Sequence, residues 1–129
     1  MQVIEVWGRI FLSTLFLIEG INKILNYEGT IQYMESFGVP EYLAMPAIII
    51  EILFPLLLII GYKTKIASLV IAIFTIIVAT IFHTNFDDHM QFITFFKDTA
   101  IAGGFMIIMV NGSGRFSLDY ILKSNKTNA

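Results

Sequence analysis

The residues best suited to chemistry are ionisable side chains inside apolar stretches of the sequence. Glu51 lies near the middle of the apolar run LAMPAIIIEILFPLLLII. A carboxylate in hydrocarbon costs roughly 2.5–3.5 kcal/mol, so it faces the protein interior or a wet cavity, where it can exchange protons or pair with a cation. Alternatively Glu51 carries a proton, since removal from water disfavours the charged form. Glu51 is therefore the first candidate site residue.

Pro55 follows Glu51 by four residues, which is one helical turn. Its ring lacks the N–H that the Glu51 carbonyl would otherwise accept, and it presses on that carbonyl. We expect a local helix bend with a free backbone acceptor beside the buried acid.

Further ionisable residues occur in the other apolar segments, and most are expected toward the same end as Glu51. They are Glu19, Lys23, His83, Lys97 and Asp98, whereas Arg9 and Glu5 are expected at the opposite end. One interpretation is a polar site in which Lys97, Lys23 or Arg9 neutralises Glu51. The other is simple pairing along one helix, Glu5 with Arg9 and Glu19 with Lys23, while long side chains reach the headgroup region.

The stretch HTNFDDH raises the question of a metal site, because His83, Asp87, Asp88 and His89 are closely spaced nitrogen and oxygen ligands. Their spacing matches no defined metal motif, and acids in an exposed loop are ordinary. We therefore expect no metal there, and favour His83 as a hydrogen-bond or proton-transfer group.

Composition indicates that membrane helices position these residues. Of the 129 residues, 57% are hydrophobic and only 14% charged, against about 25% charged in soluble domains. Four apolar segments, about 3–25, 43–60, 66–82 and 92–110, each approach the roughly 20 residues that a spanning helix needs. We predict an all-α, four-helix membrane bundle comprising one domain, 1–122, followed by a polar tail, 123–129. There are no cysteines for thiol chemistry and no basic cluster for nucleic acid.

The connections add detail to this bundle. Tyr27, Ile31, Met34 and Phe37 recur at helical spacing in the first connection, which predicts a short amphipathic helix lying in the membrane interface. Ser117-Leu118-Asp119 is expected to begin another short helix after the fourth segment. The last residues of the polar tail are expected to fray.

The distribution of basic residues predicts the topology. Lys63 and Lys65 follow the second segment, and Arg115, Lys123 and Lys126 follow the fourth, whereas the first and third connections contain none. The positive-inside rule then places both termini in the cytoplasm.

Small residues predict where helices approach closely. Gly20 in the first segment and Gly103 with Gly104 in the fourth are expected at helix–helix contacts. Gly103 and Gly104 favour packing inside the bundle, with a homo-oligomer face as the alternative.

The chain resembles the DoxX family of small bacterial four-span membrane proteins over nearly its whole length. The matching pieces are Arg9 with LFLIEGINKIL, the run FGVP before the second segment, Ile50-Glu51 leading to Gly61, Ala79 through His83, and FFKDTAIAGGFMIIMVNGSGRFSLD. The resemblance implies a bacterial inner-membrane protein. Some of its relatives are associated with thiosulfate:quinone oxidoreduction, and others with a superoxide dismutase and a thiol-oxidising partner.

Two departures from the family pattern bear on the site. Leu53-Phe54-Pro55 stands where relatives commonly have glycines, and Asp98 stands where they have Asn after the lysine. An acid beside Lys97 could neutralise it, which weakens an anion-binding role for Lys97.

Three functions follow from these observations. The first is a membrane component of a redox system, with quinone as a possible cofactor and a soluble or membrane redox partner supplying electrons, because the chain has no cofactor motif. The second is a membrane scaffold for soluble partners. The third is a carrier for a small anion or a proton-coupled step.

Overall fold

The chain is helical in nearly all of the part that the structure describes. This computed structural model describes residues 2–112, 114 and 117–128. Its elements are α1 (Gln2–Leu25), α2 (Tyr27–Ser36), the 3-10 turn η1 (Glu41–Leu43), α3 (Ala44–Ile60), α4 (Thr64–Phe82), α5 (His89–Asn111) and α6 (Leu118–Asn128). No strand occurs in these ranges, which confirms the all-α prediction.

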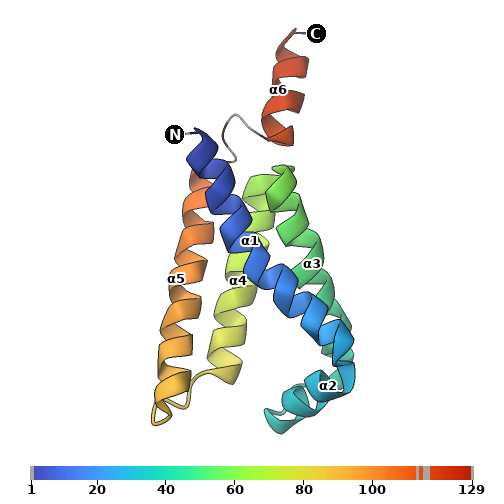
Figure 1. Cartoon of the computed structure of the whole chain (residues 1–129), viewed down its shortest axis with the longest axis vertical. Helices are drawn as coiled ribbons and strands as arrows, with labels where there is room; N and C mark the ends of the chain where they lie inside the picture. The colour runs from blue at the N-terminus through green and yellow to red at the C-terminus, as the bar shows by residue number, and fades with distance from the viewer. Residues whose placement is uncertain (1, 113, 115–116, 129) are drawn as a thin grey trace.

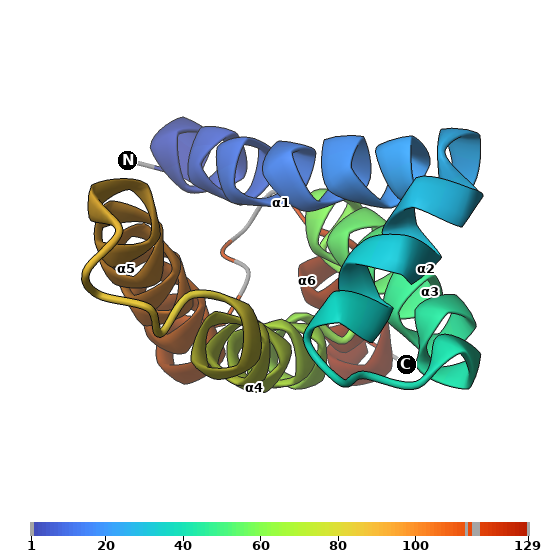
Figure 2. The same cartoon turned by 90° about the horizontal axis from the view of Figure 1, so that it is seen from below.

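The four long helices form an elongated assembly. Helix α1 packs along α3, α3 lies beside α4, and α4 packs most closely with α5 (Figure 1). Seen along the assembly, α3 and α5 lie on opposite sides, with α1 and α4 between them (Figure 2). The chain end at Gln2, the α3–α4 turn and α6 share one end, whereas α2 and the α4–α5 loop share the other.

Three helical segments in the described chain are long and apolar enough to cross a membrane. They are Glu41–Ile60, which combines η1 with α3, then Thr64–Phe82 and His89–Asn111. Helix α1 has 24 residues, or about 36 Å at 1.5 Å per residue. It carries four ionisable residues, Glu5, Arg9, Glu19 and Lys23, and its composition is accordingly more polar. The prediction that α1 also spans the membrane therefore stays a prediction.

The apolar core joins the four long helices. Phe16 of α1, Leu58 of α3, Ile71 of α4 and Phe105 of α5 are buried together, and the Phe16 and Phe105 rings meet edge to face with centroids 5.5 Å apart. On α1, Arg9 precedes Phe16 in sequence, whereas Glu19 and Lys23 follow it. The core therefore lies between two groups of polar residues on α1.

Helix α2 occurs where the sequence predicts a short amphipathic helix. Met34 of the predicted stripe is buried, and Tyr33 stacks on Phe82 at the end of α4 with centroids 5.3 Å apart. Gly38 ends the helical path with a left-handed φ of 77°, a conformation that glycine adopts without steric cost. The proposed interfacial position of α2 is not tested by these contacts.

Helix α3 remains helical through Pro55, which is buried. The missing N–H therefore does not end the helix, and the predicted bend stays a prediction. The α3–α4 turn forms at Gly61, whose φ is 81°. At the other end of the chain, α6 continues to Asn128, so helical backbone extends into the segment predicted to be a frayed tail.

Candidate functional site

The central contact of the candidate site is an ion pair between α1 and α3. Lys23 Nζ donates to Glu51 Oε1 at 2.5 Å, with the Glu51 side chain 2% exposed and that of Lys23 29% exposed. Lys23 is thus the partner of Glu51 among the three cations that the sequence left open. The structure pairs Lys23 across the helices rather than with Glu19 one turn before it.

Gly20 allows the two helices to approach at this point. A Cβ atom at Gly20 would lie 2.8 Å from Ile52 Cγ1 and 3.3 Å from Glu51 Cβ. Contacts this short leave no room for a larger residue without movement of α1 or α3. The close approach brings the backbone of α1 beside Glu51, so that Lys23, one turn further on, can reach the carboxylate.

Glu51 also lines a small cavity. Within the described part of the chain, the buried Oε2 has no hydrogen-bond partner. The cavity has a volume of about 80 Å³, and its polar lining consists of Glu19, Glu51, Thr75, His83, Thr94 and Asp98. A water molecule occupies about 30 Å³ in the liquid, so this cavity has room for two or three. A buried polar oxygen without a protein partner normally has a water or ion as its partner.

His83 and Asp98 line the same cavity as Glu51. His83 Nε2 lies 3.8 Å from Asp98 Oδ2. We call Glu19, Lys23, Glu51, His83 and Asp98 the Glu51 cluster.

Lys97 does not join the Glu51 cluster. Successive residues on an α-helix are about 100° apart, so Asp98 faces the bundle whereas Lys97 lies exposed beside Phe92, Phe96 and Ala100 on the outer surface of α5. The expectation that Lys97 neutralises Glu51 is therefore not met. From the sequence we expected that Asp98 could neutralise Lys97. In the structure Asp98 lies next to His83.

Arg9 belongs to a second polar cluster at the other end of the core. Its side chain is 2% exposed, and Nη1 donates to the Leu58 carbonyl at 2.8 Å. Gly61 lies against Arg9 and Ser117 so closely that a Cβ there would approach Ser117 Cβ to 2.4 Å. The charges of Glu5 and Asp119 also act on the guanidinium. We call Arg9, Gly61, Ser117 and Asp119 the Arg9 cluster.

Asp119 ties α6 to the α3–α4 turn in the Arg9 cluster. Its two carboxylate oxygens accept the backbone N–H groups of Lys63 at 2.7 Å and Thr64 at 2.9 Å, while its own N–H donates to the Gly61 carbonyl at 2.8 Å. Ser117 Oγ accepts the N–H of Tyr120 at 3.2 Å. Sequence reasoning placed a helix start here, but not this tertiary contact, which joins residues more than 50 positions apart.

Two residues that line the cavity were not identified as candidate site residues from the sequence. Thr75 and Thr94 each donate their hydroxyl to a carbonyl of their own helix, that of Ile71 at 2.7 Å and that of Met90 at 2.7 Å. Their oxygens can then only accept hydrogen bonds from the cavity. The sequence did contain a signal for each threonine. Thr75 is on the same face of α4 as Ala79 and His83, and Thr94 is on the same face of α5 as Asp98.

The loop residues considered as metal ligands have local roles. Asp88 accepts the N–H of Met90 at 3.0 Å and caps α5, which begins at His89. Across the residues that the structure describes, no group of three or more His, Cys, Asp or Glu side chains is arranged to hold a metal ion.

Glycines of α5 differ in their surroundings. A Cβ at Gly104 would lie 3.3 Å from the Leu12 side chain of α1, so Gly104 contributes to packing inside the bundle, whereas a Cβ at Gly103 would meet nothing within 4 Å. The two glycines therefore do not share one packing role.

The fold and the apolar helices define an all-helical membrane protein with a buried ionisable site, and comparison with known proteins identifies its family. The sequence model of the DoxX family matches residues 5–84. This chain belongs to the DoxX family.

Three curated relatives are similar to this chain. Inner membrane protein YqjF of Escherichia coli (strain K12) is 37% identical over 115 residues, which cover 89% of this chain and 88% of the relative. Inner membrane protein YphA of the same strain is 32% identical over 119 residues, covering 87% and 85%. "Putative oxidoreductase CatD" of Bacillus subtilis (strain 168) is 33% identical over 65 residues, covering 50% and 48%. No solved structure matches significantly.

Proposed function

We propose that this protein is a four-span inner-membrane component of a redox system, in which the Glu51 cluster exchanges protons with a quinone. A redox partner, soluble or in the membrane, supplies or accepts the electrons. The single observation that carries the proposal is the buried carboxyl of Glu51, a residue that lines a cavity together with His83 and Asp98.

The proposed membrane placement makes α1 the fourth span and puts α2 in the outer interface. The exposed side chains of α1 are largely apolar, including Trp7, Phe11 and Ile18, while Arg9 is buried and Lys23 is paired. Helix α1 begins at the end of the assembly where α6 lies (Figure 1), as four membrane crossings require. Lys63 and Lys65 lie there too, so this end is assigned to the cytoplasm; Arg115, part of the same prediction, lies outside the described residues.

The chemistry follows from the groups in the cavity. Reduction of a quinone to a quinol takes two electrons and two protons, and oxidation returns them. Glu51, Asp98 and His83 can each hold or release a proton, and Lys23 stabilises Glu51 when it is charged. The sequence contains no cysteine for thiol redox chemistry, and in this proposal the electrons pass between the quinone and the partner.

The cavity is too small to hold a quinone ring, and its size favours a role in proton transfer. Ligand pockets span about 300–1,000 Å³, whereas this cavity holds about 80 Å³. The head group therefore approaches from the lipid beside the cluster, and protons pass through water between Glu51 and His83. The printed name "Putative oxidoreductase CatD" of the relative that matches half of this chain supports a redox setting.

The test is quinone-dependent stabilisation of the purified protein. A ligand that binds only the folded state at 100 times its Kd adds about 2.7 kcal/mol to the free energy of unfolding. We expect a short-chain quinone analogue to raise the Tm of the wild-type protein, and Glu51→Gln, which keeps the side-chain size, to abolish that rise. Asp87→Asn, in the exposed α4–α5 loop, is the matched control and should respond like wild type.

No rise in Tm with ubiquinone or menaquinone analogues would reject the quinone assignment. The ionisable residues Glu51, His83 and Asp98, which line one cavity, make a proton-coupled carrier the second candidate. In that case proteoliposomes would show uptake of a weak acid that follows an imposed pH gradient and is lost in Glu51→Gln.

A further inference from the structure

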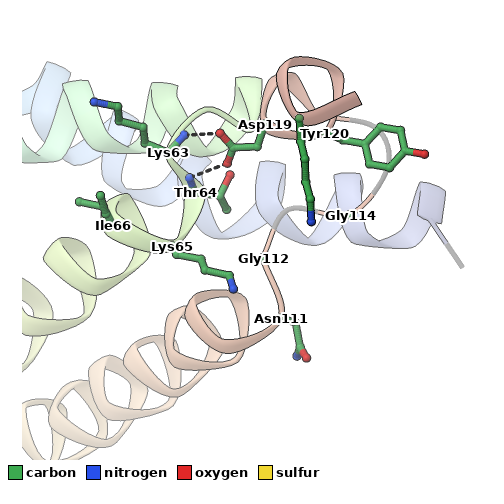
Figure 3. Close-up of a pocket in the computed structure, with 10 residues that line it drawn as sticks. Lys63, Thr64, Lys65, Ile66, Asn111, Gly112, Gly114, Asp119 and Tyr120 are labelled. Atoms are coloured by element: carbon green, nitrogen blue, oxygen red, sulfur yellow. Dashed lines mark hydrogen bonds between the residues drawn. The ribbon is translucent and has the colours of Figure 1, made fainter. Parts of the chain in front are cut away.

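A larger pocket lies at the opposite end of the molecule from the Glu51 cluster. It has a volume of about 380 Å³ and lies between the start of α4, the end of α5 and α6 (Figure 3). This volume falls within the range of about 300–1,000 Å³ that is usual for ligand sites. The core of Phe16, Leu58, Ile71 and Phe105 separates this pocket from the Glu51 cluster.

The lining of this pocket has an excess of positive charge. Lys63, Lys65 and Lys123 line it, and Asp119 is the acidic residue among its described lining residues. Both carboxylate oxygens of Asp119 already accept backbone N–H groups at the start of α4. The carboxylate is therefore held by the peptide backbone, and the lysines outnumber it.

The lysine side chains differ in direction. The Lys63 side chain points away from Asp119 (Figure 3), and its amine lies 5.6 Å from the centre of the Tyr62 ring. Lys65 points toward Gly112, and its Cε would lie 3.4 Å from a Cβ at that glycine. Lys65 and Lys123, from α4 and α6, are therefore the amines assigned to the pocket.

A buried hydroxyl adds an observation independent of the lysines. Thr64 lines the pocket, is 1% exposed, and its Oγ1 has no hydrogen-bond partner in the described part of the chain. A hydroxyl and ammonium groups together offer several donors, which is the chemistry that a phosphate requires. Ile66 and Tyr120 add exposed apolar surface beside the charges.

We propose that this pocket binds a phosphate-bearing anion, namely the head group of an acidic phospholipid at the end of the molecule where α4 begins and α5 ends. Two membrane-compatible helices start or finish at this level, which is the depth of lipid phosphates. Basic pockets between membrane helices bind acidic head groups, and each lysine near the surface contributes appreciably to the affinity. Free phosphate shares this chemistry and is the other source that the experiment must separate.

The experiment measures Tm of the purified full-length protein in a neutral detergent. Phosphatidylglycerol, phosphatidylcholine and inorganic phosphate are titrated in separate arms. We expect phosphatidylglycerol to raise Tm in a saturable way while phosphatidylcholine does not. Lys65→Gln and Lys123→Gln should each weaken the apparent affinity about fivefold.

Matched variants keep the result interpretable. Lys97→Gln removes a lysine from the exposed face of α5 near the other end and should bind phosphatidylglycerol like wild type. Replacement of both Lys65 and Lys123 by Arg keeps the charge and should retain binding even if a single Gln variant folds poorly. A rise in Tm with inorganic phosphate equal to that with phosphatidylglycerol would overturn the lipid assignment. No rise with either ligand, or an undiminished rise in both Gln variants, would overturn the site itself.

Discussion

Glu51 is defined at the residue scale by its two unlike oxygens. Oε1 accepts a hydrogen bond from Lys23 Nζ at 2.5 Å, whereas the buried Oε2 has no hydrogen-bond partner in the described part of the chain. One oxygen therefore holds the carboxylate in place, and the other keeps an unused acceptor. His83 and Asp98, 3.8 Å apart, supply the next proton-binding groups along the same cavity.

Removing Lys23 should be more harmful than neutralising Glu51. Lys23→Met leaves a buried carboxylate without its cation, which costs about 3–5 kcal/mol in comparable pairs, whereas Glu51→Gln removes the charge and keeps the shape. Chemical denaturation of the purified variants measures the difference.

The double variant separates pairing from packing. Lys23→Met with Glu51→Gln should recover part of the stability lost in Lys23→Met alone, because no unpaired charge remains. Equal losses for the two single variants, without recovery in the double variant, would show that the pair contributes no coupling.

At the scale of elements, glycine positions decide how close α1 comes to its neighbours. Gly20 lets α1 approach α3 beside Glu51, and Gly104 faces Leu12, while Gly103 faces open space. The three glycines looked alike in the sequence as small residues of membrane helices. Their roles differ because neighbouring helices cover only some faces of α1 and α5.

Gly20→Ala and Gly103→Ala should change the free energy of unfolding in opposite directions. The first places a methyl group 2.8 Å from Ile52 Cγ1 and should destabilise the protein by about 1–3 kcal/mol, the usual cost of overpacking. The second meets no neighbour and should stabilise by up to about 1 kcal/mol, because alanine is the better helix former. Thermal unfolding in one detergent measures both, and a loss of stability in Gly103→Ala would mean that its open face is covered by a second copy.

For the whole molecule, two polar clusters lie on either side of one apolar core. The Glu51 cluster includes His83 at the end of α4, and the Arg9 cluster includes Gly61 of the α3–α4 turn and Asp119 of α6. In the second cluster, Asp119 accepts two N–H groups from the start of α4. This contact fixes α6 against the end of the bundle that carries the lysines.

The proposed topology can be tested with single cysteines because the chain has none of its own. Asn85→Cys, in the α4–α5 loop, should react with an impermeant maleimide added to intact spheroplasts. Asn125→Cys, in α6, should react only after the membrane is permeabilised. Labelling of both from outside, or the reverse pattern, would contradict the four-span arrangement with inward termini.

The sequence by itself determined the helices and the position of Glu51 within an apolar run. Long apolar runs predict α1, α3, α4 and α5 to within three residues at each end, and the stripe through Met34 predicts α2, because hydrophobic periodicity and backbone conformation are local properties. A carboxylate in an apolar run is equally visible in one dimension, since its cost depends only on its surroundings being apolar.

Only the tertiary structure decided which charges meet. Lys23, not Lys97 or Arg9, pairs with Glu51, and Asp98 rather than its neighbour Lys97 faces the cavity. The physical reason is helix rotation: one residue turns a side chain by about 100°, so small differences in helix orientation choose between adjacent residues. Helix orientation is set by packing between helices, notably at Gly20, Phe16 and Phe105, and that packing cannot be read from spacing along the chain.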